Sequence, residues 1–409
     1  MLSRRALLKL SACSPVALAF GAAASTQDQW GASQGYPTGW GPAGQAQSWD
    51  AYPAYRVGNY SGGLEGMFSF GVIQASNKPS PLLAAPKNIT YKWKGTRLTV
   101  EDYLNKWPAT GLMIARKGQV WSEQYRLGRT ASSRFTSWSM AKSVTSLLLG
   151  IAMDQGLVNS LDDMPEDYVS SLKGTAHGQI KIRHLINMIS GIDVIYDRDT
   201  IKINDAGIRG VENARAVNTD LEKLVREWQG IAYAPGTYFS YSELSALAIG
   251  MVLREVSKMS LTAYAQINLW QPMGAQSNAT WLLDSMGKEY NCVGFAACLR
   301  DWTRIGQLIA QRGQMQGRQV VSSAWIDDYY AFGPEDATVR FGLVEEGVGY
   351  KNFYWHPRPD SAWLMMNGKH GQRVLIDRAT QTVLTQTAVV DGSEWRDELY
   401  ALFDAAVAL

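Results

Sequence analysis

The residues with the clearest chemical potential are a serine and a lysine three positions apart, where an apolar run begins. Ser139 and Lys142 belong to the stretch WSMAKSVTSLLLGIA, residues 138–152. Residues i and i+3 share one face of a helix, so a helix beginning here places the ammonium beside the hydroxyl. Serine attacks only after a base removes its proton, and a lysine serves as that base when burial keeps part of it neutral. The spacing therefore suits acyl transfer through a serine ester.

The bare S-x-x-K pattern has little specificity by itself. The pattern occurs again as Ser170–Lys173 and Ser285–Lys288, where no buried helix follows. Such a pattern marks a helix cap with a surface lysine more often than it marks a catalytic pair. The stretch GASQG around Ser33 matches the nucleophile-elbow pattern G-x-S-x-G, which needs a strand before the serine and a helix after it. The surrounding sequence predicts neither element, so Ser33 is interpreted as a chance match.

Two later stretches give the Ser139 motif a family context. PGTYFSYSELSALAIGMVL (235–253) and NGKHGQRVLIDR (367–378) follow it in the chain. In this order the three stretches resemble the motifs of serine β-lactamases and penicillin-binding proteins, over about residues 90–409. The stretches LWQPMGAQSNATWLLD and GFAACLRD, and HGQ in the third motif, resemble the 6-aminohexanoate-dimer hydrolase branch.

The resemblance implies a role for each matching residue. Ser139 corresponds to the nucleophile, Lys142 to its basic partner, and Tyr241 to the tyrosine that passes the proton to the leaving group and later activates water. A free phenol has a pKa near ~10, so it needs a nearby cation to act as a phenolate at neutral pH, and Lys142 is the first candidate. The implied oxyanion hole uses the backbone N–H groups of Ser139 and Gln372.

The chain departs from the family pattern at the expected substrate-binding residues. Glu243 stands where many relatives have an asparagine, and a carboxylate cannot donate as an amide does. His370 occupies the place of a threonine, and Gly371 is expected to let the substrate approach. Lys369 is either a cation for a substrate carboxylate or an ordinary solvated lysine. A Ser-His-Asp triad built on His370 is a further alternative, which Lys142 makes unnecessary.

The sequence therefore predicts a serine hydrolase that cleaves an amide or ester bond of a small molecule through an acyl-enzyme, without a cofactor or metal. One alternative is a β-lactamase or peptidoglycan DD-peptidase, which Glu243 disfavours. Another is a catalytically silent binding protein on the same scaffold, which the intact Ser139, Lys142 and Tyr241 disfavour. Esters are the expected substrates, followed by linear oligoamides.

The N-terminal residues read as an export signal. Residues 1–24 combine a basic start, a short apolar stretch and small residues at the end, and SRRALLK resembles a twin-arginine signal. A lipoprotein box ending at Cys13 and an uncleaved anchor are the alternatives. The expectation is a periplasmic or secreted protein with no stable membrane insertion after cleavage. Cleavage would remove Arg4, Arg5 and Lys9 and change the net charge from +2 to −1. A nearly neutral protein of this kind gives no electrostatic reason to expect nucleic-acid binding.

The remaining 385 or so residues, about 46% hydrophobic over the whole chain, are enough for a large core. Strands near both ends and helices between them predict an α/β (α+β) fold, with an antiparallel sheet flanked by helices. The expected divisions are an irregular N-terminal extension (25–90), a sheet domain (91–160 and 300–409) and a helical domain (161–299). Cys292 and Cys298 are interpreted as two small buried residues rather than a disulfide.

Overall fold

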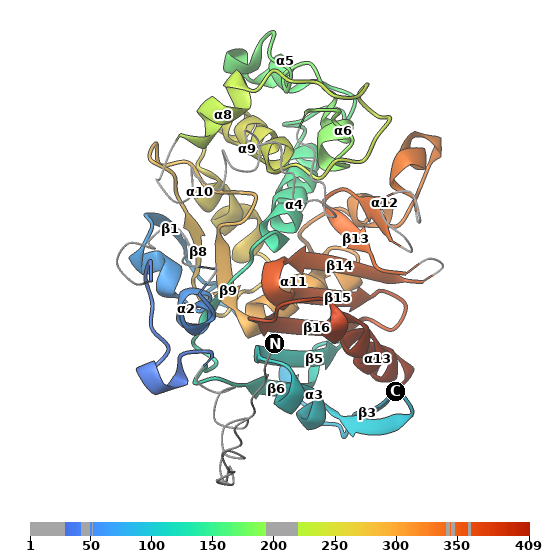
Figure 1. Ribbon diagram of the computed structural model, residues 1–409. Coiled ribbons are helices and arrows are strands. Elements are labelled where there is room, and N and C mark those ends of the chain that lie inside the picture. Colours follow the sequence, from blue (N-terminus) through green and yellow to red (C-terminus); the bar gives the residue numbers. More distant parts are fainter. Residues whose placement is uncertain are drawn as a thin grey trace, which may run out of the picture.

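The computed structural model describes residues 29–41, 50, 52–193, 220–340, 344, 348–358 and 361–409. Its main sheet has 8 strands in the order β12-β13-β14-β15-β16-β5-β6-β2 and is built from both ends of the chain, as predicted (Figure 1). The strands of this sheet are β2 (Leu83–Ala84), β5 (Ala109–Arg116), β6 (Gln119–Tyr125), β12 (Gly349–Lys351), β13 (Tyr354–His356), β14 (Trp363–Gly368), β15 (Gln372–Asp377) and β16 (Thr382–Ala388). The predicted export signal lies outside the described residues.

The centre of this sheet joins the early and late parts of the chain. β5 pairs antiparallel with β16, so that Thr382 lies opposite Arg116 and Thr385 opposite Met113. Seven of the eight residues of β5 are buried, which explains its nearly continuous apolar sequence. β5 and β6 form a hairpin, and Lys117 and Gly118 both take the positive φ that its tight turn requires.

Helices cover both faces of the sheet. α11 (Leu299–Ala310) packs on β5, β15 and β16, and a Cβ atom at Gly306 would lie 2.6 Å from Val383 Cγ1, so glycine permits this close approach. On the other face lie α13 (Glu394–Ala408) and α3 (Val100–Lys106), beside the hairpin of β3 (Thr90–Trp93) and β4 (Thr96–Thr99). The core of the sheet domain therefore lies in two layers.

The predicted helical part stands at one end of the sheet (Figure 1). Its longest helices are α4 (Met140–Asp154) and α9 (Glu243–Ser257), which pack on each other. Both begin at a serine N-cap, Ser139 and Ser242. The shorter helices there are α5 (Pro165–Tyr168), η3 (Ser170–Leu172), α6 (Ile182–Ile186), α8 (Leu221–Glu227), α10 (Leu261–Ala265) and η4 (Gln266–Trp270).

A second sheet was not predicted. It has 4 strands in the order β1-β8-β9-β7. They are β1 (Phe70–Ile73), β7 (Arg134–Thr136), β8 (Ala279–Leu282) and β9 (Phe295–Cys298), so residues 161–299 are not wholly helical. This sheet matters for the site because β7 leads directly into Ser139.

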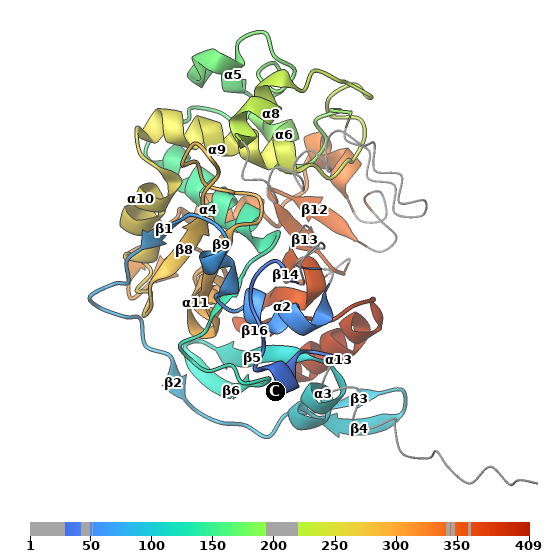
Figure 2. The ribbon, with the colours of Figure 1, turned by 60° about the vertical axis from the view of Figure 1, so that its left-hand side comes forward.

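The N-terminal extension is more regular than expected. It contains η1 (Ala32–Gln34), α2 (Pro53–Asn59) and η2 (Gly63–Gly66), and α2 lies across the body of the molecule near β14 and β16 (Figure 2). The Thr136 N–H donates to the Tyr60 carbonyl over 2.9 Å, and Arg134 forms an ion pair with Glu65. These elements are too short to show a clear apolar periodicity in the sequence. They are stabilised by contacts with residues that lie far away in the chain.

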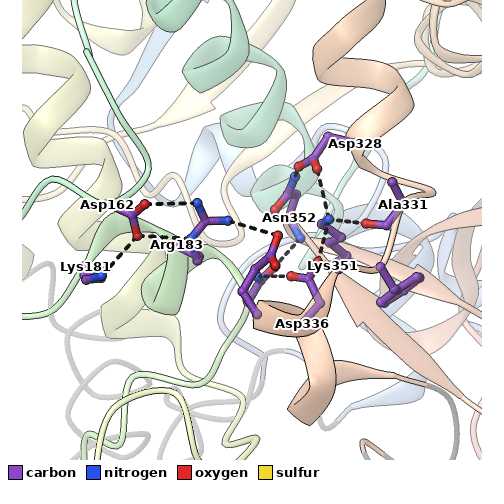
Figure 3. A network of polar contacts seen from close by, with 12 residues as sticks. Asp162, Lys181, Arg183, Asp328, Ala331, Asp336, Lys351 and Asn352 are labelled. Atoms are coloured by element: carbon purple, nitrogen blue, oxygen red, sulfur yellow. Dashed lines mark hydrogen bonds and ion pairs between the residues drawn. The ribbon is translucent and has the colours of Figure 1, made fainter.

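The helical part and the late strands are joined by a polar network (Figure 3). The Lys351 ammonium, 2% exposed, lies 2.8 Å from Asp336 Oδ2 and 2.9 Å from Asp328 Oδ1. The Asn352 N–H donates to Asn187 Oδ1, just after α6, over 2.8 Å. The elements around it are η5 (Pro334–Val339) and α12 (Ser323–Asp328), which follow β10 (Gln314–Met315) and β11 (Arg318–Gln319).

Two further expectations concern cysteines and membrane segments. Cys292 and Cys298 are both buried and are not joined in a disulfide, which confirms their interpretation as core residues. Among the described residues, no helix is both long and apolar enough to span a bilayer.

Candidate active site

Ser139 sits where β7 turns into α4. Ser137 anchors the turn by donating its hydroxyl to the Val293 carbonyl over 3.0 Å. Trp138 then takes a left-handed conformation with φ 45°, which is strained for a bulky residue. Ser139 follows as the N-cap of α4, and its side chain is half-buried while the helix behind it is buried almost throughout. The turn therefore presents one hydroxyl at the front of a buried helix.

Lys142 is buried one turn into α4. Its ammonium donates to Ser139 Oγ over 3.2 Å and to the Cys292 carbonyl over 3.1 Å, and lies 4.8 Å from the centre of the Tyr241 ring. Burial alone would lower the pKa of Lys142, but charge interactions with Tyr241 and Glu243 oppose it and hold the pKa above its usual value. Lys142 therefore keeps its proton, which fits the expected cation beside Tyr241 better than a neutral base.

Tyr241 directly precedes the N-cap of α9. The loop before it is held by a hydrogen bond of 2.8 Å from the Ser240 N–H to the Met188 carbonyl. The Tyr241 ring stacks on Trp355 at 5.8 Å and meets the edge of Tyr350 at 6.1 Å. These two rings come from the β12–β13 hairpin and hold the phenol beside Lys142. The structure thus brings Ser139, Lys142 and Tyr241 together.

Glu243 is the first residue of α9, where a carboxylate interacts favourably with the helix dipole. The Cys292 thiol lies 3.8 Å from Glu243 Oε2, and the Glu243 charge acts on Lys142. The partners of this carboxylate that the structure shows are thus side chains of the protein around Lys142.

The third motif forms the turn between β14 and β15, and its register differs from the expectation. The Gln372 N–H donates to the Lys369 carbonyl, and the Gln372 side-chain amide donates to the Ala388 carbonyl over 2.6 Å. A Cβ atom at Gly371 would lie 2.6 Å from Val390 Cγ2, inside the protein. Gln372 and Gly371 therefore face the sheet rather than an open cleft.

Gly368 is the glycine that approaches the nucleophile. A Cβ atom at Gly368 would lie 2.3 Å from the Ser137 carbonyl oxygen and 3.2 Å from Trp138 Cβ. The next backbone N–H belongs to Lys369, and no partner for it is found within the described part of the chain. Both 368 and 371 are glycines, so the sequence alone could not show which of them faces Ser139.

The side chains of Lys369 and His370 have partners inside the protein. The Lys369 ammonium lies 2.6 Å from Asp50 Oδ2 and 5.2 Å from the centre of the Trp138 ring. His370 Nδ1 lies 3.1 Å from the Val390 carbonyl oxygen and 3.2 Å from Asp391 Oδ1. Burial, with the nearby charges of Arg56 and Lys369, lowers the pKa of His370 to about 4. His370 is therefore neutral at pH 7 and packs as a structural residue.

The other sequence matches lack the required context. Ser170 lies in the short η3, and Ser285–Lys288 forms a turn around Asp284. Ser33 lies in η1, with no strand before it in the described chain. The described residues also contain no group of three or more His, Cys, Asp or Glu side chains suited to a metal ion.

An apolar pocket opens beside Trp138, on the side of the N-terminal extension. Its walls are formed by Leu64, Phe68, Thr136, Trp138, Leu282, Tyr290 and Val293. The extension therefore contributes side chains next to the residue that precedes the nucleophile.

Comparison with known proteins shows the family of the chain. A family model described as Beta-lactamase matches residues 98–408. A 6-aminohexanoate-dimer hydrolase from Paenarthrobacter ureafaciens is 22% identical over 334 residues, which are 79% of this chain and 82% of that protein.

Solved structures show the same fold. A structure from Bacillus anthracis assigned as a 6-aminohexanoate-dimer hydrolase matches with a TM-score of 0.76 at 19% identity, covering 86% of this chain and 94% of that one. A family VIII carboxylesterase matches with a TM-score of 0.57 at 14% identity, covering 74% and 93% of the two chains. The predicted β-lactamase/transpeptidase-like fold is confirmed.

Proposed function

Because the chain belongs to the β-lactamase family, we propose that it is a serine hydrolase that cleaves an amide or ester bond through an acyl-enzyme on Ser139. The observation that carries this proposal is the contact of one buried ammonium, that of Lys142, with both the Ser139 hydroxyl and the Tyr241 ring. A protein that only bound ligands would not need to bury a lysine between a hydroxyl and a phenol.

The proposed proton path runs through Tyr241. Lys142 holds its own proton, so Tyr241, acting as a phenolate beside this ammonium, accepts the proton of Ser139 while the serine oxygen attacks the substrate carbonyl. Tyr241 then gives this proton to the leaving alcohol or amine and is a phenolate again. In the second half, Tyr241 removes a proton from the water that attacks the serine ester, and it returns this proton to Ser139 Oγ as the acid leaves. The Lys142 ammonium stabilises the negative charge that develops on the phenol and serine oxygens.

The proposed oxyanion hole uses the backbone N–H groups of Ser139 and Lys369. The Gln372 N–H is already used within the turn, whereas Gly368 brings the Lys369 N–H to the backbone that precedes Ser139. Losing one such donor typically slows acyl transfer by about 10²–10³-fold.

The proposed substrates are small esters and linear amides. The relatives include a protein named as a 6-aminohexanoate-dimer hydrolase and a carboxylesterase, and the two reactions share the same acyl chemistry. A β-lactamase or DD-peptidase is less favoured, because Lys369 is paired with Asp50 and Glu243 adds a negative charge near Lys142. Both features oppose the carboxylate that β-lactams and peptidoglycan stems carry.

Covalent labelling tests the nucleophile. After exposure to a fluorophosphonate, intact-mass spectrometry should show one adduct, and peptide mapping should place it on Ser139. Ser139→Ala should abolish labelling and lower kcat/KM for p-nitrophenyl acetate by about 10⁴-fold or more, with the melting temperature close to that of the wild type.

Ser285→Ala is the matched control, because Ser285 also begins an S-x-x-K sequence. It should keep full labelling and activity. An adduct on Ser33, Ser170 or Ser285 would contradict the assignment. Turnover of p-nitrophenyl acetate, a linear 6-aminohexanoate dimer and nitrocefin by the wild type then ranks the three substrate classes.

A further inference from the structure

Part of the N-terminal extension touches the residues on both sides of the proposed oxyanion hole. Asp50 and residues 52–60 precede residues 98–408, which carry the family match. Asp50 and Tyr60 contact the two segments that carry the proposed donors, and Arg56 reaches the turn at 368–371 through Asp391. Figure 2 shows α2, which contains Arg56, in front of the ribbons of β14 and β16.

The first contact fixes the side chain of Lys369. Asp50 Oδ2 lies 2.6 Å from the Lys369 ammonium, and the Asp50 carbonyl accepts a 2.6 Å hydrogen bond from Arg56 Nε. The backbone of Asp50 is thus held independently of its carboxylate. The ion pair in turn limits how far the turn that carries the Lys369 N–H can move.

The second contact holds the next residue of the turn. The Arg56 side chain is 8% exposed, and its Nη1 lies 2.7 Å from Asp391 Oδ2. The other oxygen of Asp391 lies 3.2 Å from His370 Nδ1. Arg56 therefore braces His370 through Asp391, just after β16.

The third contact reaches the other donor. The Tyr60 ring meets the edge of Trp138 at 5.3 Å, while the Tyr60 carbonyl accepts the Thr136 N–H. Trp138 has the strained φ of 45° immediately before Ser139. Packing against Tyr60 therefore helps to keep Trp138 in a conformation that it would not favour alone.

From these contacts we infer that Asp50 and residues 52–60 form a brace that sets the distance between the two oxyanion donors, the Ser139 and Lys369 N–H groups. Because this role has meaning only for acyl transfer, it rests on the proposed function. Oxyanion donors act over about 2.7–3.1 Å, and a displacement of about 1 Å can cost up to 10²-fold in rate. Asp50, Arg56 and Tyr60 are positioning residues, since none of them is placed against the reacting atoms.

Asp50→Asn tests the brace, because it removes the carboxylate charge and leaves the backbone contact to Arg56. We expect kcat for p-nitrophenyl acetate to fall about tenfold with KM changed less than twofold, since the donors act mainly in the transition state. Asp50→Glu, which keeps the charge, should recover most of kcat. The matched control is Asp404→Asn on α13, which breaks the 2.6 Å ion pair of Asp404 with Arg358 and should leave kcat unchanged.

Hydrogen–deuterium exchange gives a second readout that does not need turnover. In Asp50→Asn, peptides covering residues 137–142 and 366–372 should exchange faster than in the wild type, and in Asp404→Asn they should not. If the wild type neither labels at Ser139 nor turns over any substrate, the proposed function fails. The exchange measurement then still shows whether the Asp50 contact restrains the two backbone segments. An unchanged kcat in Asp50→Asn, or unchanged exchange in both segments, would overturn the inference.

Discussion

At the scale of single residues, Lys142 shows how neighbours decide what a catalytic group can do. Burial favours the neutral amine, and the nearby Tyr241 and Glu243 favour the ammonium more strongly. Glu243 replaces the asparagine expected from the family resemblance, so this chain has an additional negative charge near its lysine. We propose that this carboxylate helps to keep Lys142 protonated.

Glu243→Gln should therefore change the pH dependence of the reaction. Without the carboxylate charge the pKa of Lys142 falls, so the alkaline limb of the kcat/KM profile should move to lower pH. The measurement is kcat/KM for p-nitrophenyl butyrate from neutral pH to beyond the ordinary lysine pKa of about 10.4. Glu255→Gln, an exposed position on the same helix, is the control. An alkaline limb that stays in place in Glu243→Gln would show that Glu243 does not hold the lysine proton.

The sequence could predict the grouping of Ser139, Lys142 and Tyr241 because short-range spacing and two motif contexts point to it. It could not predict the register of the third motif. Two glycines three residues apart both fit, and only the approach of Gly368 to the Ser137 carbonyl distinguishes them. The sequence also could not predict the ion pair between Lys369 and Asp50, because the two residues are 319 positions apart in the chain.

At the scale of elements, the β12–β13 hairpin links stability to the site. Tyr350 and Trp355 pack on the Tyr241 ring, and Lys351, beside Tyr350, is held in the network of Figure 3. The carboxylate of Asp336 is fully buried there. Without Lys351, this charge would lose its principal partner in a water-excluded region.

Lys351→Met should therefore lower the free energy of unfolding by about 3–5 kcal/mol, as expected when one member of a buried ion pair is removed. Urea denaturation followed by circular dichroism measures this change. Lys181→Met is the matched control, since its pair with Asp162 is exposed on both sides and is worth less than about 1 kcal/mol. Equal small losses in the two variants would contradict the importance of the buried network.

Long helices and the main strands were predictable from apolar periodicity and serine caps. α13 runs over Glu394–Ala408 with a largely apolar buried face, and the Ser322 hydroxyl caps α12 by accepting from the Trp325 N–H. The four-stranded second sheet was missed because its strands have 3 or 4 residues each, and because β1 and β7 pair with strands more than a hundred positions later in the chain. Too few residues repeat in such strands for a pattern to appear.

At the scale of the whole molecule, buried histidines make folding sensitive to acid. Burial lowers the pKa of His177 to about 4 and that of His356 to about 3, whereas an unfolded histidine titrates near ~6.5. Between these values the unfolded chain binds more protons than the folded chain. The free energy of unfolding should therefore fall as the pH drops from about 6.5 towards 4, by up to about 1.4 kcal/mol per pH unit for each histidine.

Urea titrations at several pH values between 7 and 4 measure this slope. His177→Gln should remove the contribution of one histidine, so that its stability falls less steeply than that of the wild type. His184→Gln, at a half-buried position with a smaller shift, should change the slope less. A slope in His177→Gln equal to that of the wild type would show that this histidine is not held neutral in the folded state.

The pairing of β5 with β16 also has a consequence for how the protein is made. A ribosome releases β5, β7 and α4, with Ser139, long before it has synthesised β16 or the turn at 368–371. β5 must wait for its partner β16, which follows more than 250 positions later, and such long-range pairing folds slowly. Until the last strands emerge, the nascent chain carries its serine without the second oxyanion donor, so we expect it to be inert toward substrates during translation.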